Sequence, residues 1–210
     1  MIFMLILSAL IGYLLGSVNS SLVIGKLFYK KDVRKFGSGN AGATNTLRIL
    51  GKSAALSVVT GDILKGILAC LIGLYLVGET SPGVYVGEYI AGLFAVIGHN
   101  WPVYFGFKGG KGVLTSLSVA LMFSPLAALV CLVAFIVILA LTRFVSLGSV
   151  VCAVIFAPAA YLFGGSIYTV LAGAILALFI VFRHLPNIKR LISGNETKIS
   201  FRSKSAEEKV

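Results

Sequence analysis

The sequence contains few charged residues. Only 12% of its 210 residues are Asp, Glu, Lys or Arg, whereas 58% are hydrophobic, and its mean hydropathy is +1.01. Soluble domains contain about 25% charged residues, so a soluble globular protein is excluded. The composition predicts an integral membrane protein with helical spans, because lipid offers no partner to the backbone groups of an open sheet edge. The apolar runs are continuous rather than alternating, which excludes a membrane β-barrel.

Residues that bind metals or act as nucleophiles are also scarce. The chain has seven acidic residues, two histidines and three cysteines. Cys70, Cys131 and Cys152 lie in separate apolar runs without the spacing of metal ligands, and we assign them a structural role. The sequence shows no carboxylate pair and no serine triad. We therefore expect a protein that needs neither a metal nor another cofactor.

The apolar residues fall into seven segments, which predict an all-α bundle of seven transmembrane helices. They are residues 1–25, 53–78, 86–104, 112–123, 125–141, 146–163 and 166–182. The fourth is short for a bilayer, which needs about 20 residues. It could instead continue into the fifth as one helix kinked at Ser124-Pro125. We expect a single domain over residues 1–198, followed by a flexible charged tail at 199–210.

The distribution of basic residues decides between these alternatives. With seven crossings, the loops at 26–52, 105–111 and 142–146 share one side with the tail from Arg183, and together they hold every lysine and arginine except Lys65. Fusing the fourth and fifth segments would separate Arg143 from the basic tail. The positive-inside rule then places the N-terminus outside and the C-terminus in the cytosol. It also explains the net charge of +11 without nucleic acid.

One of these loops, Phe105–Gly112, has a composition suited to phosphate. It contains glycines at several positions, including Gly109 and Gly110, and two lysines, Lys108 and Lys111. Peptide N–H groups of glycine-rich turns form anion-binding nests, and the lysines add full charges. The spacing does not match a nucleotide P-loop. The alternative is that the lysines only reach toward lipid headgroups.

A second loop, residues 37–45, combines small residues with hydrogen-bond donors. Its glycines fit G-x-G-x-x-G, but no buried strand precedes them, so we reject a dinucleotide site. A plain flexible loop remains an alternative. We favour an anion nest that leads into a helix, with Arg48 following as a planar fork suited to phosphate. The expected donors are Ser38, Asn40, Thr44 and Asn45.

Four further polar residues lie close to the expected cytosolic face. Asp62 and Lys65 are one helical turn apart, and we expect an ion pair that eases insertion or supports a neighbouring loop. His99 and His184 lie where spans meet the cytosol, as simple interfacial hydrogen-bonders or as functional groups. Neither is followed five positions on by aspartate, which excludes the H-x-x-x-x-D pair of soluble-type glycerolipid acyltransferases.

The phosphate donors of the four cytosolic stretches should therefore gather at one membrane face. They are Ser38, Asn40, Arg48, Lys108, Lys111, Arg143, Ser149, His184 and Asn187. A site with many cations and no evident nucleophile predicts a substrate that brings its own reactivity.

Four motifs in these stretches resemble those of the bacterial acyl-phosphate:glycerol-3-phosphate acyltransferases, the PlsY family. They are GSGNAGATN (37–45), GHNWPVYFGFKGGKGV (98–113), RFVSLGS (143–149) and RHLPNIKRLISGNE (183–196). The resemblance implies a seven-helix membrane bundle that transfers a fatty acyl group from acyl phosphate to glycerol 3-phosphate, giving lysophosphatidic acid. It implies that the active-site positions are Ser38, Arg48, Lys111, Ser149, His184 and Asn187. We expect the substrate phosphates to contact Asn40, Gly42, Thr44, Asn45, His99, Lys108, Gly109 and Gly110.

Several alternatives remain open from the sequence. Either a histidine or a substrate phosphate could take the proton of the attacking hydroxyl. The expected partners are acyl phosphate, glycerol 3-phosphate and membrane lipids, but the sequence does not assign each phosphate to a loop or predict an oligomeric state. A phosphate-ester transporter is the rival function, although the donors crowd one face. A structural subunit would leave the glycine-lysine stretch unexplained.

Overall fold

The computed structural model describes residues 1–199, and every regular element in that range is helical. The α-helices are α1 (Ile2–Ser17), α2 (Ser20–Phe28), α3 (Ala43–Leu50), α4 (Lys52–Val77), α5 (Val86–Asn100), α6 (Val113–Phe123), α7 (Pro125–Thr142), α8 (Val145–Leu162) and α9 (Ile167–Ile192), with short 3-10 turns η1 (Val33–Lys35) and η2 (Val103–Phe105). The predicted flexible tail lies outside the described residues except for its first position. Ile199 is buried, and its backbone N–H donates to the carbonyl of Arg143 over 2.9 Å.

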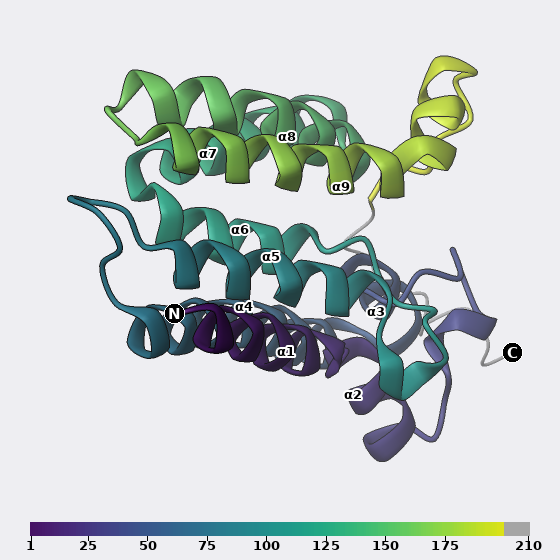
Figure 1. Ribbon diagram of the computed structural model, residues 1–210. Helices are drawn as coiled ribbons and strands as arrows, with labels where there is room; N and C mark the ends of the chain where they lie inside the picture. The colour runs from purple at the N-terminus through teal and green to yellow at the C-terminus, as the bar shows by residue number, and fades with distance from the viewer. Residues whose placement is uncertain (200–210) are drawn as a thin grey trace, which may run out of the picture.

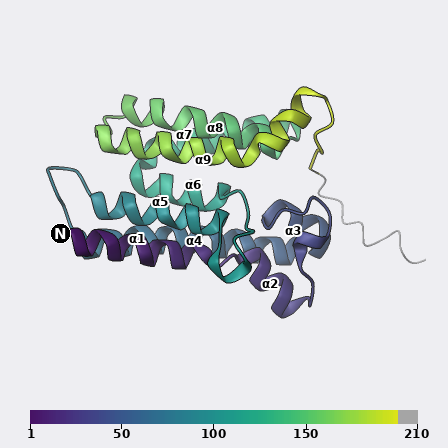
Figure 2. The same cartoon turned by 45° about the vertical axis from the view of Figure 1, so that its right-hand side comes forward.

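The long helices form two layers (Figures 1 and 2). Helices α1, α4, α5 and α6 make one layer, and α7, α8 and α9 make the other. The loops after α2, α5 and α7 and the end of α9 all lie at the end of the bundle opposite the N-terminus. The sequence prediction that the basic stretches share one side is therefore confirmed.

Helix length and hydropathy identify four membrane spans within residues 1–199, namely α4, α7, α8 and α9. The pair α1 and α2 makes a fifth if it is counted as one bent span. Helix α6, with 11 residues, is apolar but short, and α5 has 15 residues. The fold is thus that of an integral membrane protein with four or five spans by this measure.

The boundary between α6 and α7 agrees with the charge argument. Helix α6 ends at Phe123, and α7 begins at Pro125, the position where a missing backbone N–H costs nothing. The chain then passes from one layer to the other (Figure 1). The two segments are separate helices rather than one kinked helix.

The first apolar segment is broken, which the sequence analysis did not predict. Helices α1 and α2 meet at a bend of 41° around Val18 and Asn19. The Asn19 side chain accepts a hydrogen bond from the Leu22 N–H at 3.1 Å, capping α2, and donates to the Ala41 carbonyl at 3.3 Å. A polar side chain inside an apolar run therefore starts a new helix directed at the loop that carries residues 37–45.

Close packing holds α1 against α5. Gly12 and Gly16 lie four residues apart on α1, and a Cβ at either position would overlap the carbonyl of Ala91 or Ala95 on α5. Small residues at this spacing let two helix backbones approach, which is how helices associate in lipid. This contact fixes α5, the helix that leads into the glycine-lysine loop.

A buried ion pair supports the bend from α4. Lys65 Nζ lies 2.8 Å from Asp62 Oδ1 and donates to the Val18 carbonyl, which the break in the helix leaves unpaired, at 3.0 Å. Ser20 Oγ donates to the same carboxylate at 2.9 Å. The expected ion pair is confirmed, and it binds both helices that meet at the bend.

We expect Lys65→Met to destabilise the protein severely. The substitution keeps most of the side-chain volume but leaves the Asp62 carboxylate buried without its cation, which typically costs about 3–5 kcal/mol. Thermal unfolding in detergent should show a large fall in Tm, and Asp62→Asn in the same chain should restore much of it. Lys52→Met, at an exposed position of the same helix, is the matched control. Equal Tm values for the two single variants would refute this role.

Candidate active site

The loop at residues 37–45 is held by one side chain. Asn45 Oδ1 accepts from the Ser38 N–H at 2.9 Å, and Asn45 Nδ2 donates to the Val33 carbonyl at 2.9 Å. Gly37 and Gly39 have φ values of 58° and 71°, which favour glycine and turn the backbone as a nest requires. Asn45, expected as a phosphate donor, thus also shapes the loop, which leads at Ala43 into α3, the helix that the sequence predicted.

An arginine joins this loop to the glycine-lysine loop. Arg34 Nη1 donates to the carbonyls of Phe105 at 2.9 Å and Lys108 at 3.0 Å. Asp32 fixes the guanidinium from behind, with a contact of 2.7 Å. The hydrogen bond from Arg34 lowers the pKa of Asp32 to about 2, so the carboxylate remains ionised. The two loops therefore open at the same end of the bundle.

A second arginine holds the glycine-lysine loop from α9. Arg183 donates through Nε and Nη2 to the Gly110 carbonyl at 3.1 and 2.8 Å, and its guanidinium lies over the Trp101 ring. Gly110 cannot carry a side chain, because a Cβ there would overlap the His99 ring and the Ala41 carbonyl. Several of its N–H groups are paired as well, for example those of Phe107 with the Pro102 carbonyl and of Gly109 with the Asn100 carbonyl. Lys111 is therefore the charged group that this loop presents to the cavity.

His99 belongs to the ion-pair cluster behind the loop. Its Nδ1 lies 2.9 Å from Lys65 Nζ and 3.5 Å from Asp62 Oδ1, and the residue is buried. Its main-chain carbonyl accepts from the Gly110 N–H at 3.2 Å. Because the lysine ammonium only donates, Nδ1 accepts and Nε2 carries the hydrogen. Asp62 and Lys65 thereby support the loop through His99, one of the roles that the sequence left open for them.

A polar network surrounds Lys111. Its Nζ donates to Asn187 Oδ1, and Asn187 Nδ2 donates to Glu196 Oε1 at 2.7 Å. Glu196 also accepts from Ser146 Oγ and from Arg190 Nε, both at 2.7 Å. Burial opposes the ionisation of Glu196, but these three hydrogen bonds hold its pKa below the ordinary value. The Glu196 carboxylate thus orients the Asn187 side chain, which in turn accepts the hydrogen bond from Lys111.

The charge on Lys111 is poised near neutral pH. Burial lowers the pKa of Lys111 to about 8, Glu196 opposes the shift, and the neighbouring guanidiniums of Arg190, Arg183 and Arg48 add to it. A lysine crowded by cations favours the arrival of an anion, since an anion relieves the repulsion. This arrangement is typical of a phosphate site.

His184 and Ser149 each form one side-chain hydrogen bond to a main-chain carbonyl. His184 Nδ1 lies 2.8 Å from the Ile180 carbonyl, which can only accept, so Nδ1 carries the hydrogen and Nε2 keeps a lone pair. Ser149 Oγ donates to the Val145 carbonyl at 2.8 Å. Both residues are buried. The histidine is therefore oriented as a proton acceptor, and the serine is not activated as a nucleophile.

These groups line one cavity of about 770 Å³. Of the residues predicted from the sequence, it brings together Ser38, Asn40, Gly42, Thr44, Asn45, Arg48, His99, Gly109, Lys111, Ser149, His184 and Asn187. Lys108 and Gly110 do not line it: Lys108 is exposed, and the Gly110 carbonyl faces Arg183. The two loops share one pocket, as the sequence analysis required.

The sequence analysis missed six polar residues of this cavity as site candidates. They are Asp62, Ser146, Arg183, Arg190, Glu196 and Thr197. Arg183 and Glu196 lie within a motif that was recognised, which was the available signal. Their roles depend on contacts with residues far away in the sequence, and no local pattern indicates those contacts.

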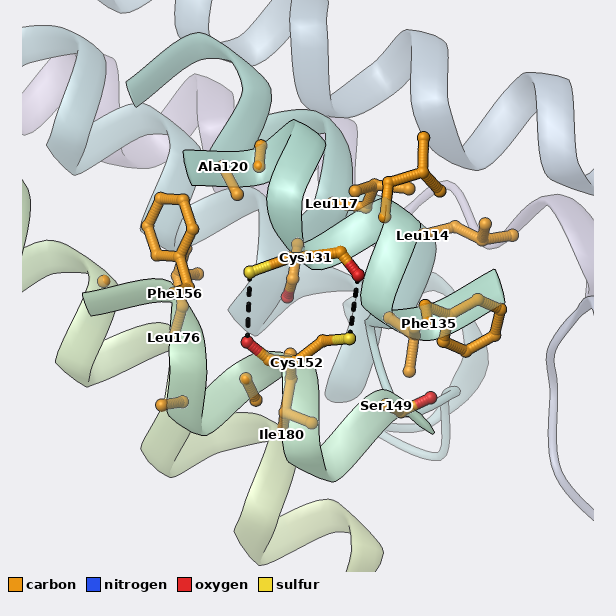
Figure 3. A pocket seen from close by; sticks show the side chains of 17 residues that line it. Leu114, Leu117, Ala120, Cys131, Phe135, Ser149, Cys152, Phe156, Leu176 and Ile180 are labelled. Carbon is orange, nitrogen blue, oxygen red and sulfur yellow. Dashed lines mark hydrogen bonds between the residues drawn. The ribbon is translucent and has the colours of Figure 1, made fainter. Parts of the chain in front are cut away.

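An apolar groove of about 180 Å³ adjoins the polar cavity (Figure 3). It lies between α6 of one layer and α7, α8 and α9 of the other. Val113, Leu114, Phe135 and Ser149 line both spaces. A molecule with a phosphate at one end and a hydrocarbon chain at the other would fit across this junction.

Comparison with known proteins gives a consistent result. Residues 6–194 match the family model described as Glycerol-3-phosphate acyltransferase. The chain is 45% identical to the glycerol-3-phosphate acyltransferase of Thermoanaerobacter pseudethanolicus over 92% of this chain and 95% of the relative. It is 42% identical to that of Clostridioides difficile over 94% and 97%, respectively.

Solved structures agree with these sequence matches. The crystal structure of PlsY, an integral membrane glycerol 3-phosphate acyltransferase, in its glycerol 3-phosphate form has a TM-score of 0.86 to this chain and 36% identity. The alignment covers 93% of this chain and 96% of that chain. The lysophosphatidic acid form gives a TM-score of 0.84.

We expect phosphate binding to the free protein to weaken as the pH rises through about 8, because Lys111 then loses its proton. A phosphate monoester has its second pKa near 6, so a small probe such as methyl phosphate stays a dianion over this range. Fluorescence of Trp101, the single tryptophan, can report the Kd at each pH.

Lys111→Arg is the matched variant for this measurement, because a guanidinium stays charged up to at least about pH 12. Its Kd should be independent of pH between 7 and 9, whereas Glu196→Gln should move the transition to lower pH by removing a charge that favours the ammonium. A transition that survives unchanged in Lys111→Arg would show that another group titrates.

Proposed function

The chain belongs to the glycerol-3-phosphate acyltransferase (PlsY) family of integral membrane enzymes of phospholipid synthesis, and from this premise we propose that its acyl donor is an acyl phosphate. The acceptor is glycerol 3-phosphate, and the products are lysophosphatidic acid and inorganic phosphate. Crystal structures of a PlsY relative have been determined in a glycerol 3-phosphate form and a lysophosphatidic acid form, which agree with this acceptor and this product.

The junction between the polar cavity and the apolar groove carries this proposal. An acyl phosphate has a charged head directly attached to an apolar chain, and the junction offers a charged space and an apolar space in contact at Ser149 and Phe135. The polar side holds four cations, Arg48, Lys111, Arg183 and Arg190. Such a charge excess suits two phosphates bound together.

We assign the residues of the cavity to two phosphate subsites. Lys111 and Asn187 are hydrogen-bonded to each other and serve one phosphate. Arg48, with Ser38 and the other small residues of the loop at 37–45, serves the second. Ser149 and His184 lie between the two groups at the carbonyl carbon. Lys108 and Gly110 are not included, since neither lines the cavity.

The reaction needs positioning more than activation. Acyl phosphate is a mixed anhydride, and its phosphate is already a good leaving group. The glycerol hydroxyl attacks the carbonyl carbon, the carbonyl oxygen takes the negative charge, and the C–O bond to phosphate breaks as the carbonyl re-forms. Cations placed in advance stabilise the charge that develops, typically by a factor of 10²–10³ for one donor. Transfer is direct, because neither Ser38 nor Ser149 is hydrogen-bonded to a base within the described chain.

The proton of the attacking hydroxyl has two candidate acceptors. His184 Nε2 keeps a lone pair because Nδ1 is bonded to the Ile180 carbonyl. A phosphate oxygen of the donor is the other. We favour His184, since its ring is buried and held in one orientation.

The same premise extends to the membrane. We propose seven crossings, with α1 and α2 as one bent span and α5 and α6 completing the bundle. The N-terminus lies outside, and the loops of the site face the cytosol of the bacterial inner membrane. The concentration of lysines and arginines at the end of the bundle that holds the cavity supports this orientation.

The donor can be tested directly with purified protein. We expect glycerol 3-phosphate to be acylated from palmitoyl phosphate but not from palmitoyl coenzyme A or the carrier-protein thioester, because neither thioester places a phosphate next to the carbonyl. Thin-layer detection of lysophosphatidic acid measures the product. Lys111→Ala, expected to be 10²–10³-fold slower, controls for contaminating activity. Faster turnover of either thioester would overturn the proposal.

The proton acceptor can be tested with His184→Gln. If Nε2 of His184 takes the proton, kcat should fall and the acidic limb of the pH–rate profile should disappear, because glutamine cannot titrate. Asn187→Ala, which removes a neighbour without a titrating group, should lower kcat but keep that limb. A profile of unchanged shape in His184→Gln would transfer the role to the substrate phosphate.

A further inference from the structure

The apolar groove has a well-defined depth. Its lining residues run from position 113 to 120 on α6, 128 to 135 on α7, 149 to 156 on α8 and 173 to 180 on α9. Each helix therefore contributes a stretch of seven steps, or about 10 Å at 1.5 Å per residue. The end near Val113, Phe135 and Ser149 opens into the polar cavity. The groove thus runs away from the site, along the helices, into the bundle.

The far end of the groove is closed by Phe156. Its ring lies against Gly173 of α9, where an added Cβ would be only 2.7 Å from Phe156 Cδ1, so the absence of a side chain at Gly173 makes room for it. Phe156 is 4% exposed. Beyond it the core is filled by Ala160 and Ala172, which are buried as well. The groove therefore ends inside the protein.

The depth and the volume of the groove indicate that it holds about the same number of carbons of a hydrocarbon chain. An extended hydrocarbon chain advances about 1.25 Å per carbon, because C–C bonds are about 1.5 Å long, so a depth of about 10 Å holds about eight methylenes. The volume of about 180 Å³ is slightly larger than a cavity of about 150 Å³ that binds the six carbons of benzene. Both measures indicate seven or eight carbons.

We propose that Phe156 determines acyl-chain selectivity by closing this groove after about eight methylenes. The inference rests on the proposed function, since it takes the groove to hold the acyl chain of the donor. Each methylene up to that depth adds buried apolar surface and increases kcat/KM. Carbons beyond it meet the Phe156 ring and must turn away, so they add little.

The test is a series of saturated acyl phosphates from 4 to 18 carbons, with glycerol 3-phosphate held constant. For the wild type, kcat/KM should rise about fourfold per methylene, the equivalent of about 0.8 kcal/mol, and level off near ten carbons. Phe156→Ala should let the rise continue by about two or more carbons, because the ring leaves space behind.

A second variant shifts the limit in the other direction. Ala153 lines the groove four residues beyond Ser149, about 6 Å from the mouth. Ala153→Phe should end the rise after about five methylenes, and it adds volume rather than removing it, so it remains informative if Phe156→Ala fails to fold. Phe94→Ala, on the partly exposed face of α5 away from the groove, is the matched control and should keep the wild-type profile.

The outcomes separate this inference from the proposed function. If the wild type turns over no acyl phosphate of any length, the proposed function fails. If it is active but Ala153→Phe leaves the chain-length profile unchanged, the groove does not hold the chain and the inference is wrong. If only Phe156→Ala, folded by its Tm, leaves the profile unchanged, Phe156 is not the limit. Opposite shifts in the two variants support the proposal.

Discussion

The ion pair of Asp62 and Lys65 lies where four parts of the chain meet. Lys65 binds the carbonyl that the break between α1 and α2 leaves unpaired, and the pair contacts His99, whose main chain carries the glycine-lysine loop. Two charges removed from water cost several kcal/mol each unless every lone pair and proton is satisfied. Here they are satisfied only if the bend, α4 and α5 are all in place. The cluster therefore couples the shape of the first loop to that of the second.

The glycine-lysine loop is held through its backbone groups, and the cations of the site line the cavity. Arg34 and Arg183 bind carbonyls of the same loop from opposite sides, which joins both layers of the bundle. The positive charge is then concentrated around a space that contains only two carboxylates, Asp62 and Glu196, among the described lining residues. Both carboxylates are paired, so an incoming phosphate meets little repulsion.

The sequence predicted an all-helical membrane protein, the common end of the basic stretches and the pocket shared by two loops, because hydropathy, charge and glycine spacing are local signals. It did not predict the bend at Asn19, since a short polar stretch at residues 17–21 does not show which groups its side chains will bind. It also assigned Asn45 to substrate, whereas this side chain binds the backbone of its own loop. Glu196 was missed because it follows the end of α9, and one of its partners, Ser146, lies on α8, 50 residues away in the sequence.

The position of the groove also affects how easily water reaches the reacting carbonyl group. The proposed donor, an acyl phosphate, hydrolyses readily, so an enzyme that uses it must keep water from the carbonyl while both phosphates remain solvated by charged groups. The junction at Ser149 and Phe135 meets this need, because the carbonyl would lie at the boundary where the polar lining ends. An acyl chain that fills the groove, as proposed, would exclude water from one side of the carbonyl, and the proposed acceptor would occupy the other. Tight filling of the groove would thus favour transfer over hydrolysis as well as binding.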